Sequence, residues 1–436
     1  MKCLILAAGS GSRLRRRADS KPLFPLLGVP LIERTIRSAQ AAGADDFVVI
    51  TGHRAQPLRA FLHRLSGRIG APIATVHNAR WREAGNGVSV SAAEGKIEEP
   101  FLLLMADHLF DPELPRRLME AGAPENGLRL AVDGNRTNPL VDLEDVTRVR
   151  REGERIVEIG KGLEWYDGFD TGLFLATPAL FEALREAQAE GDTTLSGGVR
   201  RLAARGKALA LDVTGGFWCD LDDEAALKKA EAVLLQRAGG KERDGPVARW
   251  INRPLSIRLS RWLARLPVTP NQISLLSFLV SLLAAGLFMQ EGYPALAAGG
   301  VLAQLASIID GCDGEIARLK YLGSDYGGWL DAVLDRYADA LLLFGLTWHQ
   351  LHMGGGDAVL AAGFLAIVGS FMVSYTADKY DGLMREKGGG RFRIGRDVRV
   401  FVLFLGALSN QVTAVLTLIA AVMNLETLRR LVVCRG

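Results

Sequence analysis

The sequence predicts an α/β domain of the Rossmann-like type, followed by an all-α membrane domain with six transmembrane helices. Up to about Ala238, short apolar strands alternate with amphipathic helices, and charges of both signs are spread evenly. From about Pro270 onward, apolar runs of roughly 15 to 25 residues alternate with short basic or glycine-rich connections. The chain of 436 residues is 49% hydrophobic, which is high for a wholly soluble protein. We therefore expect a cytosolic domain over 1–238, a linker and interfacial helix over 239–268, and a membrane domain over 269–436.

The composition argues against nucleic acid, disulfides and zinc as parts of the function. The net charge is only +3, and no dense Lys/Arg tract with interleaved aromatic residues occurs. The four cysteines include no C-x-x-C pair, which indicates a reduced compartment. The N-terminal apolar run is about six residues long and arginines follow it, so it is too short for a signal peptide and predicts a first strand.

The elements of the first domain follow in order along the chain. Strands are expected in "KCLILAAG", "DDFVVITG" and "PFLLLMAD", and an amphipathic helix in "PLIERTIRSAQAAG". This alternation predicts a mostly parallel sheet that binds ligands at the carboxyl ends of its strands. The polar stretch "QRAGGKERDGPVAR" predicts a linker. The segment "WINRPLSIRLSRWLARL" mixes Trp, Ile and Leu with arginines, as expected for an amphipathic helix at a membrane surface.

The apolar runs predict six membrane spans, of which the fifth is short. They lie near residues 270–290, 295–319, 328–350, 357–379, 396–409 and 411–429. Lysines and arginines cluster before the first span, between the second and third, between the fourth and fifth, and in the C-terminal tail, whereas the other connections carry none. The positive-inside rule therefore predicts a multi-pass inner-membrane protein with both termini and the aspartate-bearing ends of the second and third spans in the cytoplasm.

Paired aspartates on two of these spans are the least expected feature of the membrane half. Asp310 and Asp313 are three residues apart, and Asp331 and Asp335 are four apart, so each pair shares one helical face. Four carboxylates in a membrane would cost about 10 kcal/mol at roughly 2.5 to 3.5 kcal/mol each, as much as the net stability of a domain. Facing one another they would bind hard divalent ions, Mg²⁺ or Mn²⁺. The alternative is a set of water-exposed acids near helix ends.

Two other acids in this region, Asp325 and Asp339, are interpreted as loop and flanking residues with no such role.

The spacing of the aspartates matches the pattern D-G-x2-A-R-x8-G-x3-D-x3-D, and in this the membrane half resembles the CDP-alcohol phosphotransferases. The matching positions are Asp313, Gly314, Ala317, Arg318, Gly327, Asp331 and Asp335. The resemblance implies a six-helix membrane enzyme, usually dimeric, that transfers a phosphate-linked group from a CDP donor to an alcohol and releases CMP. By position it assigns metal binding to Asp310, Asp313, Asp331 and Asp335, the general base to Asp335, and contact with the CDP moiety to Gly314, Ala317 and Arg318.

A glycine-rich loop follows the first predicted strand, in "LILAAGSGSRLRRRADSKP". Backbone N–H groups at Gly9 and Gly11 can turn onto phosphates, and Arg13 and Lys21 can neutralise the charge of a triphosphate. Asp107 ends a later strand, and Asp220 and Asp222 stand near the end of the domain. These acids are candidates for a second metal site.

These features resemble the sugar-phosphate nucleotidyltransferases across about 235 residues. The resemblance implies that four residues hold the triphosphate: Gly9, Gly11, Arg13 and Lys21. It also implies that Arg13 and Lys21 are catalytic and that Asp107 and Asp220 bind Mg²⁺. It places "GNGVSV", from Gly85, near the base and the substrate. It also implies that Lys161 faces the sugar phosphate and that Asp170, Thr171 and Gly172 line the substrate pocket. His108 is interpreted as a neighbour of the metal site or an exposed residue, not as a ligand.

The two halves fit together, because one makes an activated CDP-alcohol and the other consumes it. The combination resembles the family of bifunctional inositol-1-phosphate cytidylyltransferases and di-myo-inositol-phosphate-phosphate synthases. This implies CTP and inositol-1-phosphate as substrates, CDP-inositol as the intermediate, contact with membrane lipids, and a homodimer formed through the membrane domain. Two alternatives are a phosphotransferase with the lipid donor CDP-diacylglycerol, and an ion-coupled transporter with a nucleotide-sensing domain.

A phosphorylated acceptor would need cations beside the membrane aspartates. Five basic residues surround the cytoplasmic ends of the fourth and fifth spans: Lys379, Arg391, Arg393, Arg396 and Arg399. Arg396 and Arg399 share one helical face and are expected, with Lys379, to bind the acceptor phosphate. The alternative is that these charges only follow the positive-inside rule.

Overall fold

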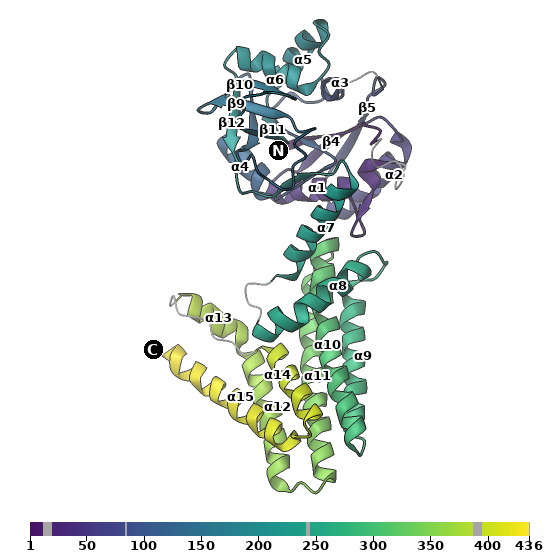
Figure 1. Cartoon of the computed structure of the whole chain (residues 1–436), viewed down its shortest axis with the longest axis vertical. Helices are drawn as coiled ribbons and strands as arrows, with labels where there is room; N and C mark the ends of the chain where they lie inside the picture. The colour runs from purple at the N-terminus through teal and green to yellow at the C-terminus, as the bar shows by residue number, and fades with distance from the viewer. Residues whose placement is uncertain (12–19, 83–84, 241–244, 387–394, 436) are drawn as a thin grey trace. The chain divides into compact units, whose positions relative to one another are not determined.

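The computed structural model describes residues 1–11, 20–82, 85–240, 245–386 and 395–435 of the chain (Figure 1). These residues form two units, Met1–Ala232 and Val233–Gly436. The division falls inside helix α7 (Glu224–Gly239), a few residues before the end of the α/β domain expected from the sequence.

A 9-stranded sheet dominates the first unit among the described residues, in the order β5-β4-β1-β6-β11-β8-β12-β10-β9. β1 is parallel to β4 and β6, β4 is parallel to β5, and β8 is parallel to β12. β11 runs antiparallel to β6, β8 and β9, and β10 runs antiparallel to β9 and β12, so the sheet is mixed and the prediction of a mostly parallel sheet was wrong. The bounds are β1 Lys2–Ala7, β4 Asp46–Thr51, β5 Ile73–His77, β6 Phe101–Met105, β8 Leu128–Asp133, β9 Arg148–Glu152, β10 Arg155–Gly160, β11 Gly168–Ala176 and β12 Ala208–Asp212.

Helices cover both faces of this sheet, which explains why its central strands are apolar throughout. Along β1, Leu4 and Leu6 enter one hydrophobic core, whereas Cys3 and Ile5 enter the other. The first core is closed by α3 (Asn86–Ser91), α5 (Ala179–Ala189) and α6 (Leu195–Ala204). The second is closed by α1 (Leu31–Ala42), α2 (Ala55–Ile69) and α4 (Glu113–Ala121). The unit is therefore a three-layer α/β/α structure.

Two short antiparallel pairs accompany the large sheet. β2 (Pro25–Leu26) pairs with β3 (Val29–Pro30) shortly after the one-turn helix η2 (Lys21–Leu23), and β7 (His108–Phe110) pairs with β13 (Trp218–Asp220). In the second pair Asp220 lies opposite His108. This pairing brings together two segments that are more than a hundred residues apart in the sequence.

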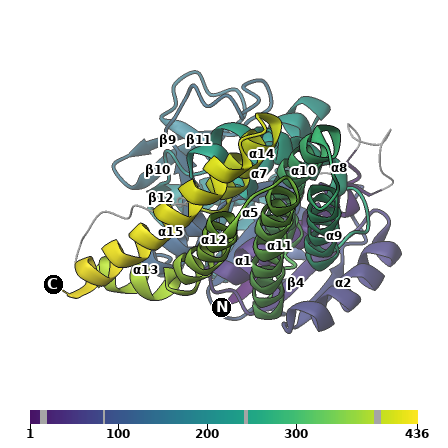
Figure 2. The same ribbon diagram turned by 90° about the horizontal axis from the view of Figure 1, so that it is seen from below.

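The second unit is helical. It contains the π-helical turn η3 (Ala248–Asn252) and the helices α8 Arg253–Leu263, α9 Pro270–Phe288, α10 Tyr293–Lys320, α11 Asp325–His352, α12 Asp357–Tyr375, α13 Ala377–Glu386, α14 Arg396–Leu408 and α15 Val412–Arg435. α9 packs against α10 and α11, α14 packs against α10, and α15 runs obliquely across α12 in both views (Figures 1 and 2). α9 therefore packs against both of the helices that carry the paired aspartates.

Glycines allow these helices to approach closely. A Cβ atom at Gly299 of α10 would lie 2.6 Å from a ring carbon of Phe288, and one at Gly345 of α11 would lie 2.8 Å from the carbonyl oxygen of Ala285. Close backbone contact of this kind is typical of helices that associate within a membrane.

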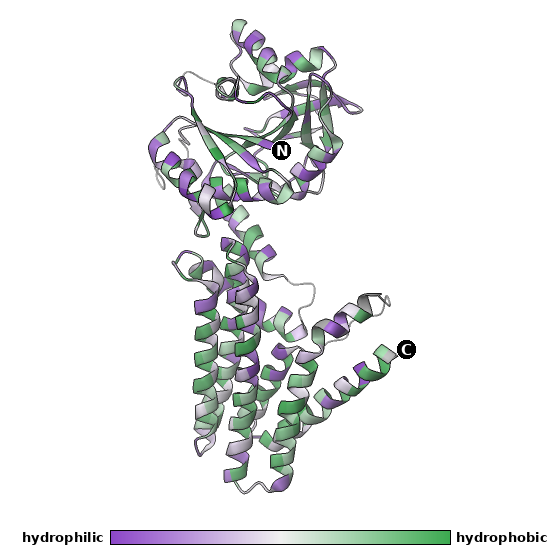
Figure 3. Cartoon of the chain, turned by 180° about the vertical axis from the view of Figure 1, so that it is seen from behind, coloured by the Kyte–Doolittle hydropathy of each residue, from purple (hydrophilic) through white to green (hydrophobic). Residues whose placement is uncertain are grey.

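Four helices in the described part of the chain are long and apolar enough to cross a membrane: α9, α10, α12 and α15. Figure 3 shows the long helices of this unit as predominantly hydrophobic. α11 is as long as α10 but carries several charges near its start, and α14 has 13 residues, about 20 Å at 1.5 Å per residue. The six predicted spans thus correspond to six helices, of which four meet the criterion of length and apolar character.

The segment between the linker and α9 forms the predicted amphipathic helix, with an unusual distribution of side chains. α8 buries Ser256 and Ser260 and packs against α10, whereas Leu255 and Trp262 are exposed. A helix that buries serine and exposes leucine and tryptophan suits an interface with lipid.

Candidate active sites

A cavity of about 930 Å³ opens at the carboxyl ends of the parallel strands in the first unit. Gly9 follows β1 and Asp107 follows β6, so both reach the cavity wall. β11 runs the other way, and its early residue Asp170 therefore lies at the same edge. Among the described residues, a Cβ atom at Gly9 would meet no heavy atom within 4 Å, which leaves room for a ligand beside its backbone. Of the residues predicted for this site, the wall includes Gly9, Gly85, Asp107, Lys161, Asp170 and Asp220.

A buried lysine and several carboxylates form the centre of this site. Nζ of Lys21 lies 2.7 Å from Oδ2 of Asp107, 2.5 Å from Oδ1 of Asp222 and 3.9 Å from Oδ1 of Asp220. The lysine side chain is only 8% exposed. Burial disfavours its charge, but the three carboxylates outweigh this and raise the pKa of Lys21. Lys21 is therefore a fixed cation at the end of the glycine loop.

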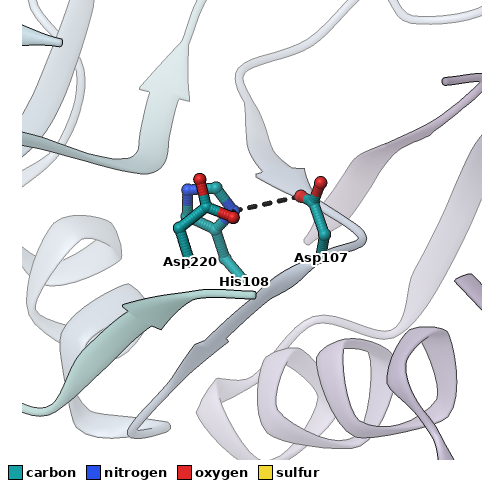
Figure 4. A group of neighbouring side chains, drawn as sticks. All are labelled: Asp107, His108 and Asp220. Atoms are coloured by element: carbon teal, nitrogen blue, oxygen red, sulfur yellow. Dashed lines mark hydrogen bonds and ion pairs between the residues drawn. The ribbon is translucent and has the colours of Figure 1, made fainter. Parts of the chain in front are cut away.

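Asp107, His108 and Asp220 offer ligand atoms within 4.8 Å of one another (Figure 4). Nδ1 of His108 lies 3.1 Å from Oδ1 of Asp107. Burial raises the pKa of Asp220 to about 6, and its Oδ1 atom is buried without a hydrogen-bond partner in the part of the chain that the structure describes. A buried carboxylate oxygen without a donor, such as Oδ1 of Asp220, fits a hard divalent cation, and the carboxylate of Asp107 lies close enough to share it.

His108 is more closely integrated into this site than the sequence indicated. Its ring stacks with that of Trp218 at a centroid distance of 6.4 Å. Gly172 has a φ of +75°, and a Cβ atom there would lie 2.7 Å from Cδ2 of His108. Burial opposes charge on His108, but Asp220 and Asp107 outweigh it and raise its pKa to about 9.

The remaining predicted residues of the first site take different positions. Gly11 has a φ of +56°, and a Cβ atom there would lie 2.5 Å from Cβ of Lys21, so only glycine fits. Nζ of Lys161 lies 2.5 Å from Oδ1 of Asp145 at the cavity wall. The hydroxyl of Thr171 donates to the carbonyl oxygen of Ala131 at 2.9 Å and is buried in the sheet. Arg13 lies outside the described residues.

The second site lies where α10 faces α11. Asp310 from α10 and Asp331 and Asp335 from α11 offer ligand atoms within 4.8 Å of one another. The carboxyl group of Asp313 lies close enough to those of Asp310 and Asp331 to interact with them electrostatically. The helical spacing therefore brings all four predicted aspartates together. Three carboxylates at this distance fit divalent cations bound by oxygen.

Two serines of α9, which the sequence analysis did not single out, hold the acids of α10. The hydroxyl of Ser274 donates to Oδ2 of Asp313 at 2.6 Å, and that of Ser277 donates to Oδ1 of Asp310 at 3.2 Å. Both serines are buried. Their spacing in an otherwise apolar helix was a signal that could have identified them.

The interpretation of Asp339 as a flanking residue was wrong. It is buried on α11, and its two oxygens contact Arg396 at 3.0 Å and Arg399 at 2.5 Å. Nη1 of Arg396 also lies 3.0 Å from Asp310 and 2.8 Å from Asp335. Both arginines of α14 thus lie beside the carboxylates, with Arg396 in direct contact with them.

Of the other residues predicted for the second site, Gly314, Ala317 and Arg318 lie on α10 and Lys379 lies on α13. Nε of Arg318 donates to the carbonyl oxygen of Ala238 at 2.7 Å, and a Cβ atom at Gly314 would lie 3.2 Å from Nη1 of Arg318. Ala317 is half-buried. Lys379 is exposed, with Nζ 5.8 Å from the ring centre of Tyr375. Arg391 and Arg393 lie outside the described residues.

Comparison with known families matches both halves of the chain. Residues 3–207 match the MobA-like NTP transferase domain, and residues 267–425 match the CDP-alcohol phosphatidyltransferase family. Both are transferase domains.

Relatives with both domains are similar to the chain over nearly its whole length. A bifunctional IPC transferase and DIPP synthase from Rubrobacter xylanophilus is 40% identical over 434 residues, which cover 98% of this chain and 95% of the relative. A relative of the same description from Aquifex aeolicus is 33% identical, over 98% of this chain and 96% of the relative. The structure of the inositol-1-phosphate CTP transferase from T. maritima is 27% identical, covers 53% of this chain and 94% of that one, and has a TM-score of 0.48. On the evidence of the full-length relatives, the chain belongs to the family of bifunctional IPC transferases and DIPP synthases.

Proposed function

We propose that the chain makes CDP-inositol from CTP and inositol-1-phosphate and then transfers inositol phosphate to a second inositol-1-phosphate, giving di-myo-inositol phosphate phosphate and CMP. The observation that carries this proposal is the presence of two separate carboxylate clusters, one in each unit, within a chain that resembles bifunctional relatives along its length. One cluster would serve each reaction.

In the first reaction, a phosphate oxygen of inositol-1-phosphate attacks the α-phosphorus of CTP, and the bond to the β-phosphate breaks to release pyrophosphate. The backbone of Gly9 and Gly11 and the ammonium group of Lys21 would hold the triphosphate, while Lys161 would orient the attacking phosphate. Asp107 and Asp220 would hold Mg²⁺, which supplies charge neutralisation at the phosphates.

In the second reaction, a hydroxyl of the acceptor attacks the β-phosphorus of CDP-inositol, and the bond to the α-phosphate breaks to release CMP. Asp335 would accept the hydroxyl proton. Asp310, Asp313 and Asp331, with Asp335, would hold Mg²⁺ or Mn²⁺, which stabilises the charge on the transferred phosphate. Gly314, Ala317 and Arg318 would face the CDP moiety, and Arg396 and Arg399 the phosphate of the acceptor.

The membrane arrangement completes the proposal. All six helices from α9 to α12 and from α14 to α15 would cross the inner membrane or lie within it, since the acids of α11 lie beside Asp310 of α10 or the arginines of α14. The distribution of Lys and Arg supports cytoplasmic termini and cytoplasmic active sites. We also infer that the first unit has a Rossmann-like fold and that the membrane helices form a homodimer.

The direct test supplies the purified full-length protein with CTP, inositol-1-phosphate and Mg²⁺ in detergent. Mass spectrometry should detect pyrophosphate, CDP-inositol, CMP and a soluble di-myo-inositol phosphate phosphate. A product that extracts into organic solvent and requires CDP-diacylglycerol would instead indicate a lipid donor, and absence of any turnover would contradict an enzymatic role.

The serines of α9 should tune metal binding at the second site. Ser274→Ala and Ser277→Ala each remove a hydrogen bond to a proposed metal ligand, so the Mg²⁺ concentration for half-maximal phosphotransfer should rise about 10- to 100-fold. Ser281→Ala is the matched control, because its hydroxyl donates only to the carbonyl oxygen of Ser277 at 3.0 Å within the helix. The same half-saturating Mg²⁺ concentration in all three variants would contradict a role of Ser274 and Ser277 in metal binding.

A further inference from the structure

A buried carboxylate outside the metal cluster connects the two arginines of α14. Asp339 lies one helical turn beyond Asp335 on α11, and its side chain is only 4% exposed. Its Oδ1 atom accepts from Nε of Arg396 at 3.0 Å, and its Oδ2 atom accepts from Nη2 of Arg399 at 2.5 Å. One carboxylate therefore fixes both guanidinium groups relative to each other.

Arg396 has two other carboxylate partners, which differ from Asp339 in their surroundings. Its Nη1 atom contacts Asp310 at 3.0 Å and Asp335 at 2.8 Å, and both of these acids belong to the proposed metal cluster. A divalent cation held there would neutralise these acids and repel the guanidinium, which weakens their attraction for Arg396. Asp339 is not a member of that cluster, so its contact with Arg396 does not compete with metal binding.

The charges of this group suit a phosphate. Arg396 and Arg399 together carry two positive charges and Asp339 one negative charge, so the three side chains have an excess of one positive charge. The Arg396 side chain is 12% exposed and contacts the cluster, whereas that of Arg399 is 5% exposed. A planar guanidinium binds phosphate best when its orientation is fixed in advance.

We infer that Asp339 is a positioning residue for the phosphorylated acceptor, because it holds Arg396 and Arg399 as a pair of phosphate-binding groups beside the metal cluster. This inference rests on the proposed transfer to inositol-1-phosphate. Asp339 itself touches no substrate, and its contribution passes through the two arginines.

The test uses the full-length protein supplied with CDP-inositol and Mg²⁺, so that the first site is bypassed. Asp339→Asn keeps the shape of the side chain but removes its charge, and the KM for inositol-1-phosphate should rise about 10- to 100-fold. The KM for CDP-inositol and the half-saturating Mg²⁺ concentration should change by less than about threefold. Calorimetric titration with inositol-1-phosphate, in Mg²⁺ without donor, should show the same loss of affinity. Asp325→Asn is the matched control, because Asp325 is exposed on the same helix.

A second variant keeps the inference testable if Asp339→Asn does not fold. Asp339→Asn combined with Arg399→Gln removes opposite charges together, so no buried charge is left unpaired. Compared with Arg399→Gln alone, the double variant should show a further rise of about 10-fold in the KM for the acceptor. This further rise would measure the loss of the ion pair between Asp339 and Arg396.

An unchanged acceptor KM, or an equal rise for donor and acceptor, would overturn the inference, since the latter is what a purely structural role predicts. Failure of the wild-type protein to use inositol-1-phosphate as acceptor would overturn the proposed function, and this inference with it.

Discussion

Replacing Asp335 by asparagine is expected to slow phosphotransfer roughly 10²- to 10⁴-fold, while CDP-inositol synthesis continues at the wild-type rate. Asparagine retains the size of aspartate and one ligand oxygen, but it cannot accept the proton of the attacking hydroxyl. Asp335 groups with Asp310 and Asp331 within 4.8 Å and contacts Arg396 at 2.8 Å. Because its replacement also weakens metal binding, the loss should lie toward the upper end of this range.

The two reactions can be separated in one assay. Given CTP and inositol-1-phosphate, Asp335→Asn should accumulate CDP-inositol and pyrophosphate, whereas the wild type consumes CDP-inositol and releases CMP. Asp357→Asn, an exposed aspartate at the start of α12, is the control and should behave as the wild type does. Unimpaired transfer by Asp335→Asn would refute its role as the base, and equal loss of both activities would point to misfolding.

The second site could be predicted largely from the sequence because helix geometry fixes it. Residues three or four apart share a face, so the pairs Asp310 with Asp313 and Asp331 with Asp335 had to present their carboxylates together on two helices. The same rule extends to Asp339, four residues after Asp335, and could have placed it on this face.

What the sequence could not provide is the set of partners from distant parts of the chain. Asp339 contacts arginines 57 and 60 residues later, and Lys21 contacts Asp222 201 residues later. Such contacts depend on how helices and strands pack, and no local periodicity encodes them. The same holds for β11, whose antiparallel insertion between β6 and β8 is a long-range pairing. It nevertheless places Asp170 at the predicted edge of the sheet.

Replacing Asp107 by alanine is expected to reduce pyrophosphate release at least about 10³-fold, because loss of a metal ligand removes several kcal/mol of charge stabilisation. Asp107 contacts both Lys21 at 2.7 Å and His108 at 3.1 Å. Its replacement therefore also removes one of the ion pairs of Lys21. Asp222 still holds Lys21 at 2.5 Å, which should keep the lysine side chain in the site. Asp45→Ala, which alters an exposed aspartate outside the cavity, is the control. Near-normal pyrophosphate release from Asp107→Ala would disprove the metal assignment.

The Asp107→Ala protein should remain an active phosphotransferase when CDP-inositol is supplied, since no described residue belongs to both clusters. A mixture of Asp107→Ala and Asp335→Asn proteins then provides a strict test of two independent sites. The second variant makes CDP-inositol and the first consumes it, so the mixture should form di-myo-inositol phosphate phosphate from CTP although neither variant does so alone. Each variant acting normally on its own supplied substrate, with no product from the mixture, would mean that the intermediate does not pass between separate proteins. If supplied CDP-inositol is not used by Asp107→Ala, the two sites are not independent.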